Sequence, residues 1–182
     1  MPSTPLPSAR VIWFTGLSGA GKSTIASALF DELTGRGIPA EYLDGDVIRG
    51  LFPGIGFTRP ERDAHVKRVG FLASRLEHHG VTTICALISP YREARDAVRR
   101  LCRRFVEVYV STPLDECERR DPKGLYARAR RRELTNFTGI DDPYEPPEHP
   151  ELTIDTTSMT VGEEVERVLA FIAEPPSTGR IG

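Results

Sequence analysis

The chain of 182 residues has no long apolar run. A helix needs roughly 20 consecutive, mostly apolar residues to span a bilayer, and no stretch here approaches that length. Residues Met1–Arg10 contain three prolines and no apolar block of the kind that a secretory signal requires. We therefore predict no membrane partner and a cytoplasmic location.

Cysteine is scarce as well. Cys85, Cys102 and Cys117 are odd in number and show no C-x-x-C spacing, which is unlike a disulfide framework or a zinc site. Their neighbours place them on faces that are predicted to be buried. We expect free thiols in the core, as a reducing cytoplasm permits.

The chain has no excess of either charge sign. It contains 24 Lys and Arg residues against 26 Asp and Glu residues, for a net charge of −2. Such a balance gives no overall attraction to nucleic acid or to a membrane surface, so we predict no nucleic-acid partner. A hydrophobic content of 39% and the length of the chain are typical of one α/β domain with a sizeable core.

The stretch VIWFTGLSGAGKST, residues 11–24, carries a recognisable chemistry. Val11–Thr15 is rich in β-branched and aromatic residues and is predicted to form a buried parallel strand. The phosphate-loop pattern G-x-x-x-x-G-K-[ST] is matched by Gly16, Gly21, Lys22 and Ser23. A chance Gly/Ser turn is the alternative, but a strand before the motif and an amphipathic helix after it favour a nucleoside triphosphate site.

Each position of this motif has a physical reason. Residues without a Cβ allow backbone N–H groups to curl around the β-phosphate. Lys22 adds a positive charge between the β- and γ-phosphates, and the Ser23 hydroxyl is suited to Mg²⁺. The predicted nucleotide-binding residues are Gly16, Ser18, Gly19, Ala20, Gly21, Lys22, Ser23 and Thr24.

Two acids follow the second predicted strand, Ala40–Leu43, in the sequence Asp44-Gly45-Asp46. Ligands of open α/β sheets bind at the carboxyl ends of the strands. One of the two carboxylates is therefore a candidate to take the proton of an acceptor hydroxyl, or to help hold the metal. An ordinary acidic turn is the alternative, since Asp-Gly is a common turn dipeptide.

Hydrophobic periodicity and capping signals outline the rest of the chain. Further strands are predicted at Val81–Ile88, Phe105–Val110 and Leu152–Asp155. Helices are predicted from about Lys22 to Gly35, from a Thr58–Glu61 capping box to about His79, after Ser89 as N-cap with Pro90, after Ser111-Thr-Pro-Leu, and from Thr160 to about Ala173. The fold class is therefore α/β, a three-layer sandwich with a mostly parallel sheet flanked by helices, as in P-loop kinases.

Arg119–Arg132 contains six arginines and Lys123. A basic run is usually a solvated helix face, and nucleic-acid binding is disfavoured by the scarcity of interleaved aromatic residues. In a phosphate-loop kinase such a run forms a lid over the transferring phosphoryl group, which we expect at about residues 119–150, with Leu134–Pro150 as a mobile loop. We predict one domain over residues 11–173 and disorder at residues 1–10 and 174–182.

From about residue 10 to 173 the chain resembles the adenylyl-sulfate (APS) kinases. Six landmarks stand in that family's order: GLSGAGKST (16–24), LDGDVIR (43–49), GF (56–57), ISPYR (88–92), FVEVYVSTPLDECERRDPKGLY (105–126) and FTGIDDPYEPPEHPEL (137–152). KGLY followed by FTGID-x-PYE-x-P is the most specific part. The resemblance implies transfer of the γ-phosphate of ATP, with Mg²⁺, to the 3′-hydroxyl of APS, giving 3′-phosphoadenylyl sulfate (PAPS).

The resemblance also implies catalytic roles. Asp46 is the base, or the carboxylate that orients the acceptor hydroxyl, and Asp44 supports it or the magnesium. Lys22 is expected to act on the transferring phosphate. Some descriptions of the family make the position of Ser89 a phosphoserine intermediate, whereas we predict direct in-line transfer, because base, metal and lysine suffice for phosphoryl transfer.

Binding roles follow in the same way. Arg49 and Arg62 would hold the phosphosulfate, since a planar guanidinium suits a diffuse dianion. Phe57 and Phe137 match the pair of rings that encloses the acceptor adenine. The remaining implied contacts are Asp44, Asp46, Ile88, Ser89 and Lys123 with the acceptor, and Arg120 with the ATP base.

The chain departs from the family pattern on the acceptor side. His65 replaces an amide thought to contact the acceptor, and Arg131-Arg132-Glu133 replaces the usual A-G-E. An imidazole can still donate one hydrogen bond, so we expect acceptor binding with altered strength or pH dependence. The alternatives are a related kinase with another acceptor and a catalytically idle nucleotide-binding regulator. The resemblance further implies a homodimer and functional coupling to an ATP sulfurylase.

Overall fold

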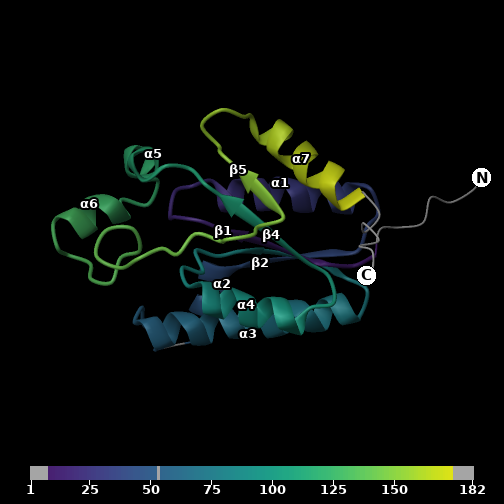
Figure 1. Ribbon diagram of the computed structural model, residues 1–182, viewed down its shortest axis with the longest axis horizontal. Helices are drawn as coiled ribbons and strands as arrows, with labels where there is room; N and C mark the ends of the chain where they lie inside the picture. The colour runs from purple at the N-terminus through teal and green to yellow at the C-terminus, as the bar shows by residue number, and fades with distance from the viewer. Residues whose placement is uncertain (1–7, 53, 174–182) are drawn as a thin grey trace, which may run out of the picture.

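The computed structural model describes residues 8–52 and 54–173. Within these residues, five parallel strands form one sheet in the order β2-β3-β1-β4-β5. Along the chain they are β1 (Val11–Thr15), β2 (Ala40–Asp44), β3 (Thr82–Ala86), β4 (Phe105–Val110) and β5 (Leu152–Ile154). Helices cover both faces of the sheet (Figure 1). The predicted three-layer α/β sandwich is confirmed.

The two faces of the sheet carry different helices. α1 (Lys22–Gly35) and α7 (Val161–Ala173) pack on one face, and α3 (Arg59–His78) and α4 (Arg92–Leu101) pack on the other (Figure 1). Alternate residues of β1 enter the two cores: Ile12 and Phe14 on the side of α1 and α7, Val11 and Trp13 on the side of α3 and α4. Because both faces are buried, this central strand is continuously apolar.

α3 begins as predicted, at a capping box. The Thr58 amide donates to the Glu61 carboxylate at 3.0 Å, and the Thr58 side chain accepts from the backbone amide of Glu61. Further along α3, a Cβ on Gly70 would collide with the side chain of Val98 in α4. The glycine therefore allows the close approach of α3 and α4.

The stretch between β3 and α4 differs from the prediction. β3 ends at Ala86 instead of Ile88, and α4 begins at Arg92 with Tyr91 as its N-cap, so Ser89 does not cap the helix. Ser89 has a φ of 40°, which L-amino acids rarely adopt. Its hydroxyl is bonded to Trp13 and Thr15 of β1. Hydrogen bonds to a distant strand thus replace the local cap that the sequence favoured.

Three short helices lie near the carboxyl ends of the strands. They are α2 (Gly45–Gly50), α5 (Leu114–Arg120) and α6 (Leu125–Arg130). α5 and α6 extend beyond the sheet at the position of the predicted lid (Figure 1). The segments with candidate functional residues therefore gather at one end of the sheet, where parallel sheets bind their ligands.

The long connection from α6 to β5 was expected to be a mobile loop, and its central part is instead held by hydrogen bonds. Tyr144 Oη lies 2.9 Å from Thr15 Oγ1, Tyr91 Oη donates to Asp142 Oδ2 at 2.7 Å, and the Glu145 amide donates to the Pro90 carbonyl at 2.8 Å. These bonds fix residues 142–145 against the end of β1 and the β3–α4 connection. Partners distant in sequence supply this anchoring, which the local composition could not reveal.

The remaining expectations concern thiols and chain ends. All three cysteines are free; Cys85 and Cys117 are buried as predicted, whereas Cys102 is partly exposed. Among the helices of residues 8–52 and 54–173, none combines the length and apolarity needed to cross a membrane. Of the predicted disorder at residues 1–10 and 174–182, residues 1–7 and 174–182 lie outside the described residues. Residues 8–10 are described, and there the Arg10 carbonyl accepts the Thr83 amide at 2.9 Å.

Candidate active site

The phosphate loop connects the end of β1 to the start of α1. Gly19 and Gly21 have φ values of 74° and 106°, in the region where a side chain causes strain. A Cβ on Gly16 would collide with the carbonyl oxygen of Val110 in β4. α1 begins at Lys22, so its N-terminal amides lie at the loop and favour an anion there. The predicted glycines thus shape a phosphate site.

Two threonines outside the motif hold the loop from the sheet side. The hydroxyl oxygens of Thr112 and Thr156 lie 2.9 and 3.1 Å from the carbonyl oxygen of Ala20, and 2.7 Å from each other. Sequence reasoning missed both residues. They stand just past the ends of β4 and β5, and polar residues at the carboxyl ends of parallel strands are the signal that could have found them.

Lys22 folds back over the loop. Its Nζ donates to the carbonyl oxygens of Gly16 at 2.9 Å and Leu17 at 2.6 Å. Burial lowers the pKa of Lys22 to about 8, and neighbouring acidic groups only partly oppose this shift. Anionic phosphate groups would give the ammonium a charged partner in place of two carbonyls, which favours its protonated form.

The predicted metal ligands Ser23 and Asp44 lie side by side. Ser23 Oγ donates to Asp44 Oδ2 across 3.4 Å, and the same carboxylate oxygen accepts a bond from Tyr42 Oη at 3.0 Å. The other oxygen, Oδ1, accepts from the amides of Asp46 and Val47 and thereby caps α2. A hydroxyl beside an oriented carboxylate is a donor set that fits Mg²⁺.

A cleft of about 330 Å³ opens beside the phosphate loop, within the size range of small-molecule sites. It is lined by Ser18, Gly19, Gly21, Lys22, Ser23, Thr24, Asp44, Asp46, Ala86, Leu87, Ile88, Arg120, Pro122 and Lys123. Gly16 and Ala20 do not line the cleft; they determine the path of the loop. The structure thus brings most of the predicted nucleotide-binding residues into one place.

Arg120 reaches the edge of this cleft from α5. Its Nη1 donates to Thr156 Oγ1 at 2.7 Å, and its Nε donates to Glu116 Oε1 at 2.7 Å. Two partners from different elements therefore fix its guanidinium plane. This placement agrees with a contact to the nucleotide, and the contact with the ATP base stays a prediction.

Asp46 stands at the boundary between the nucleotide cleft and a second cavity, and it lines both. Lys123 of the lid donates to Asp46 Oδ2 at 2.6 Å, and this bond raises the pKa of Lys123. Both side chains are largely exposed. Ile88 also borders both spaces. The carboxylate therefore lies where groups bound in the two spaces would meet.

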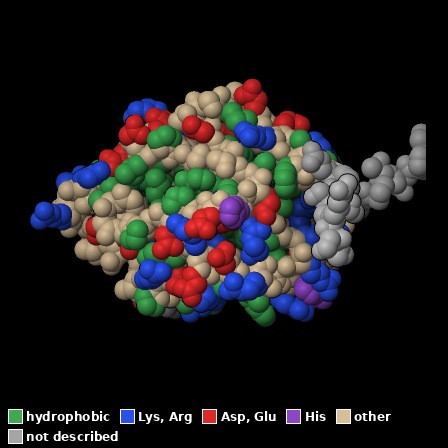
Figure 2. Space-filling view, in the orientation of Figure 1, with side chains coloured by type: hydrophobic (Ala, Val, Ile, Leu, Met, Phe, Trp, Pro, Cys, Tyr) green, Lys and Arg blue, Asp and Glu red, His purple; other side chains and the backbone are tan. Residues whose placement is uncertain are grey.

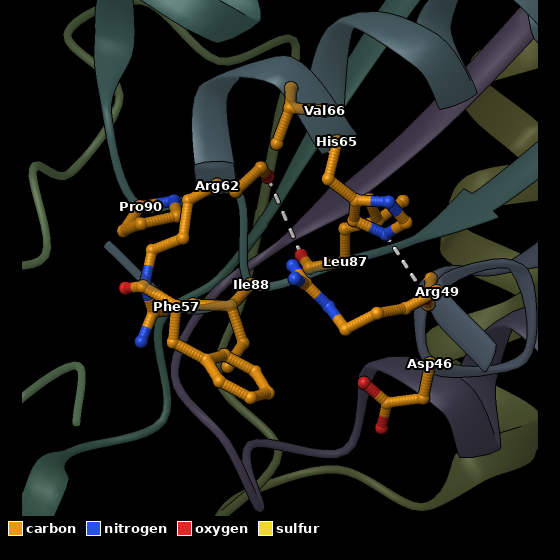
Figure 3. Close-up of a pocket in the computed structure, with 11 residues that line it drawn as sticks. Asp46, Arg49, Phe57, Arg62, His65, Val66, Leu87, Ile88 and Pro90 are labelled. Atoms are coloured by element: carbon orange, nitrogen blue, oxygen red, sulfur yellow. Dashed lines mark hydrogen bonds between the residues drawn. The ribbon is translucent and has the colours of Figure 1, made fainter. Parts of the chain in front are cut away.

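The second cavity has a volume of about 50 Å³. Figure 3 shows side chains from α2, α3 and the β3–α4 connection converging on it. Its lining consists of Gly45, Asp46, Arg49, Phe57, Arg62, His65, Val66, Leu87, Ile88, Ser89 and Pro90. Most of the predicted acceptor-binding residues are thus assembled. Sites for small molecules usually measure about 300 Å³ or more, so a nucleotide acceptor requires side chains here to move.

Phe57 and two arginines close this cavity. The guanidinium carbons of Arg49 and Arg62 lie 4.7 and 5.5 Å from the centroid of the Phe57 ring. Arg49 Nη1 donates to the Gly56 carbonyl at 2.7 Å, and Arg62 Nε donates to the Phe57 carbonyl at 2.8 Å. The ring is about half-exposed, and its neighbours are the two cations that were predicted to bind an anionic acceptor.

Phe137 does not line the cavity. It is only 9% exposed, and its ring packs edge-on against Tyr126 with centroids 5.0 Å apart. Its segment is connected to the acceptor side through Arg62, whose Nη2 donates to the carbonyl of Asn136. The predicted pair of rings around an adenine is therefore not assembled in this structure, in which Phe137 belongs to the core.

His65 is buried behind the arginines (Figure 3). Its Nε2 lies 2.9 Å from the Gly45 carbonyl oxygen, which can only accept, so Nε2 carries the hydrogen. Burial, followed by the charge of Arg49, lowers the pKa of His65 and favours the neutral ring. In the neutral form its single N–H is therefore used inside the protein in this structure, and a hydrogen bond from this imidazole to the acceptor stays a prediction.

Ser89 is a link in a buried chain of hydrogen bonds. Trp13 Nε1 donates to Ser89 Oγ at 3.0 Å, Ser89 Oγ donates to Thr15 Oγ1 at 3.0 Å, and Thr15 Oγ1 donates to the Ile88 carbonyl at 2.8 Å. The indole can only donate, which fixes the direction of the first bond. The hydrogen of the Ser89 hydroxyl is thus committed within the core, and the residue is 2% exposed.

The arginines of the predicted lid are largely paired with glutamates of the same region. The ion pairs are Arg119 and Arg120 with Glu116, Arg130 with Glu118, and Arg128 and Arg131 with Glu133. In Figure 2, positive and negative side chains alternate over the visible face. The basic run in the sequence therefore does not form a continuous cationic surface.

These features define a P-loop phosphotransferase. A glycine-shaped phosphate loop with its lysine lies at the carboxyl end of a parallel sheet, next to a hydroxyl–carboxylate pair that fits a metal. Asp46 then separates the nucleotide cleft from a cavity that contains two arginines. The site therefore provides one place for a phosphoryl donor and another for an anionic acceptor.

Comparison with known proteins gives the family: the chain belongs to the adenylyl-sulfate kinases. The family model described as Adenylylsulphate kinase matches residues 8–155. An adenylyl-sulfate kinase from Gloeothece citriformis (strain PCC 7424) is 52% identical over 159 residues, covering 87% of this chain and 90% of that protein.

Solved structures agree. The Mycobacterium tuberculosis APS kinase CysC, in complex with AMPPNP and APS, aligns with a TM-score of 0.88 at 40% identity, over 92% of this chain and 99% of that chain. A hexameric APS kinase from Thiobacillus denitrificans aligns with a TM-score of 0.71 at 36% identity, over 93% of this chain and 30% of that chain. The predicted family, enzyme class and function are thereby confirmed.

Proposed function

We propose that the protein transfers the γ-phosphate of ATP directly to the 3′-hydroxyl of APS, giving PAPS and ADP. The observation that carries this proposal is the position of Asp46, which borders both the nucleotide cleft and the arginine-lined cavity. A phosphoryl donor in the first space and a hydroxyl in the second would meet at this carboxylate. In-line transfer needs the two reactants in this relation.

The donor half of the reaction belongs to the phosphate loop and the lid. The loop amides bind the phosphates of ATP, and Lys22 exchanges its two carbonyl partners for phosphate oxygens. Ser23 and Asp44 would hold Mg²⁺, which supplies charge neutralisation at the phosphates. Arg120, held by Thr156 and Glu116, lies at the edge of the cleft for the nucleotide base.

The acceptor half belongs to the cavity. Arg49 and Arg62 bind the phosphosulfate, because two converging guanidinium groups suit an anion with delocalised charge. When Arg49 turns to the anion, it leaves the face of the half-exposed Phe57 ring, and that face then stacks on the adenine. This rearrangement also enlarges a cavity that is too small for a nucleotide in the present structure.

Asp46 accepts the proton of the 3′-hydroxyl as the acceptor oxygen attacks the γ-phosphorus. The bond from that phosphorus to the β–γ bridging oxygen breaks at the same time, and ADP leaves with the bond's electrons. Lys123, which contacts Asp46 in the present structure, moves with the lid toward the transferring phosphoryl group and offsets its charge.

Direct transfer is favoured over a phosphoserine at Ser89. The hydroxyl of this residue accepts from Trp13, donates to Thr15 and is 2% exposed. Attack on ATP would require the breaking of this buried chain. Intact-mass measurement of the enzyme with Mg-ATP and no acceptor is expected to show no added phosphoryl group, and a stoichiometric increase of one phosphoryl group would overturn direct transfer.

We further propose that the enzyme is a cytoplasmic homodimer. Exposed apolar side chains on and beside α2 and on α3 support a contact surface: Val47 at 67%, Leu51 at 71% and Phe71 at 56% exposure. Free thiols agree with a reducing compartment. Functional coupling to an ATP sulfurylase would supply APS. Light scattering after size exclusion tests the dimer, and a monomeric mass at micromolar concentration would refute it.

The first experiment is ADP release from the purified protein with Mg-ATP, measured with and without APS. Strong stimulation by APS, together with a product one phosphate heavier than APS by mass, is the expected result. ADP release that ignores APS would refute the acceptor. A screen of other hydroxylated nucleotides, with Leu or Asn replacing His65 as comparison, would then follow.

A further inference from the structure

Arg95 of α4 carries a buried charge that the proposed reaction does not use. Its side chain is 2% exposed, and that of its carboxylate partner Glu107 in β4 is 7% exposed. Arg95 Nε donates to Glu107 Oε1 at 2.8 Å. Arg95 is not among the residues that line the acceptor cavity. Buried charges of this kind are retained only where their partners are well arranged.

The other two nitrogens of the guanidinium bind two backbone carbonyls far apart in the sequence. Nη1 donates to the carbonyl of Ser89 at 2.6 Å, and Nη2 donates to the carbonyl of Glu145 at 2.7 Å. One planar fork therefore joins β4, the β3–α4 connection and the anchored part of the loop before β5. An ammonium group cannot reproduce this three-way geometry.

The carbonyl of Ser89 belongs to a residue whose backbone is strained. The φ of 40° at Ser89 is unfavourable for a residue with a Cβ and persists only where the surroundings impose it. Ile88, Ser89 and Pro90 form one wall of the acceptor cavity, and the Pro90 carbonyl accepts the amide of Glu145 at 2.8 Å. The strained wall and the anchored loop thus form a single unit around Arg95.

We propose that Arg95 is a positioning residue of the acceptor site. Its guanidinium, bonded to the Ser89 carbonyl, imposes the backbone conformation at Ser89 and thereby places Ile88 and Pro90 against the acceptor. It also holds Glu145, and so the neighbouring Asp142–Tyr144 stretch, against the same wall. The inference rests on the proposed function, because the acceptor in question is APS.

The test replaces the planar guanidinium of Arg95 with a group that has the same charge and a different geometry. In Arg95→Lys, one ammonium still compensates Glu107, but the bonds to the two carbonyls cannot all be made. We expect the KM for APS to rise by about tenfold or more, as for loss of charged hydrogen bonds, while the KM for ATP stays within about twofold of the wild-type value. A purely structural role would lower the active fraction and leave both KM values unchanged.

Two further variants separate geometry from charge. Glu107→Gln removes the carboxylate charge that pairs with both Arg95 and Arg99. Its one amide oxygen can still accept from Arg95 Nε, and Arg99 keeps Glu151 as a partner, so the KM for APS is expected to stay near the wild-type value. The double variant Arg95→Met with Glu107→Leu leaves no unpaired charge from this ion pair in the core and loses the fork. It is expected to fold, as thermal unfolding will show, and to reproduce the raised KM for APS.

The outcomes distinguish this inference from the proposed function. Wild-type ADP release that is insensitive to APS overturns the proposed function, and with it the role of Arg95 toward APS. APS-dependent wild-type turnover with an unchanged KM for APS in the folded Arg95→Lys or double variant overturns the positioning role alone. A raised KM for APS in those variants, with Glu107→Gln near wild type, supports it.

Discussion

The nucleotide half and the acceptor half of the active site are built in different ways. The nucleotide cleft measures about 330 Å³, and its largest single contribution, six of fourteen lining residues, comes from the phosphate loop and the start of α1 (residues 18–24). The acceptor cavity measures about 50 Å³ and combines residues from α2, α3, the segment before α3 and the β3–α4 connection. One half is formed before ligand binds, and the other is closed by its own arginines and Phe57.

The difference follows from what holds each half in shape. Glycine conformations and the start of α1 fix the phosphate loop through its own backbone. Side chains that bind the backbone of other segments hold the acceptor half: Arg49 on Gly56, and Arg62 on Phe57 and Asn136. Because arginine side chains rearrange more readily than a loop with fixed dihedral angles, we expect the acceptor half to be the one that adapts on binding.

The largest effect is expected at the boundary between the halves. Asp46→Ala should lower kcat by about 10²–10⁴-fold, the usual loss on removal of a positioned base, while ATP binding persists. Asp46→Asn, which keeps the shape without the basicity, should behave alike. Single-turnover kinetics and ATP titration measure the two quantities. Near-normal turnover in either variant would place the base elsewhere.

A smaller loss is expected in the nucleotide half. Lys22→Met removes the ammonium that we propose exchanges two carbonyls for the phosphates, and should lower kcat by about 10²–10³-fold and weaken ATP binding. The KM for APS should change little. Lys67→Met, on the exposed face of α3, is the matched control and should retain wild-type kinetics. Equal effects of the two substitutions would contradict the role of Lys22.

Two phenylalanines that were predicted to enclose the acceptor adenine are expected to respond differently to substitution. Phe137 is 9% exposed and Phe57 is 54% exposed. Phe137→Ala should therefore lower the free energy of unfolding by about 3–5 kcal/mol, as urea denaturation will show. Phe57→Ala should change stability by less than about 1 kcal/mol and instead raise the KM for APS. The reverse pattern would mean that the observed packing of Phe137 is not maintained in solution.

The smallest expected effect is a pH dependence of ATP affinity, which also belongs to the nucleotide half. Burial lowers the pKa of Lys22 to about 8 in the free protein, and phosphate binds the protonated form better. ATP affinity should therefore be constant well below pH 8 and fall as the pH rises through that value, by about two- to fivefold between pH 7.5 and 9. Lys22→Met should show no such dependence, and a profile shared by both proteins would assign it to another group.

Sequence patterns sufficed wherever a short segment fixes its own geometry. The phosphate loop, the Thr58–Glu61 capping box and the alternation of strands with helices were all predictable. In each case the relevant contacts lie within a few residues, so spacing alone carries the information.

The same reasoning failed where a distant partner competes with a local preference. Ser89 has the sequence signature of an N-cap, but its hydroxyl is hydrogen-bonded to Trp13 and Thr15 instead of capping the helix. The N–H of His65 donates to the distant Gly45 carbonyl in this structure, a partner that no local pattern indicated. Phe137 packs on Tyr126, although a resemblance assigns it to the adenine. No local pattern reports which of several possible partners a side chain will meet.

The sequence by itself therefore determined the fold class, the nucleotide half of the site and the identity of its charged groups. Backbone sterics at glycine and the geometry of a helix start operate over a few residues, and so they are encoded locally. Only the tertiary structure decided how the acceptor half is closed, why Ser89 is strained, and that Arg95 joins three separate segments. Those features depend on long-range hydrogen bonds inside a low-dielectric core, where each buried donor must find an acceptor that the fold alone can bring to it.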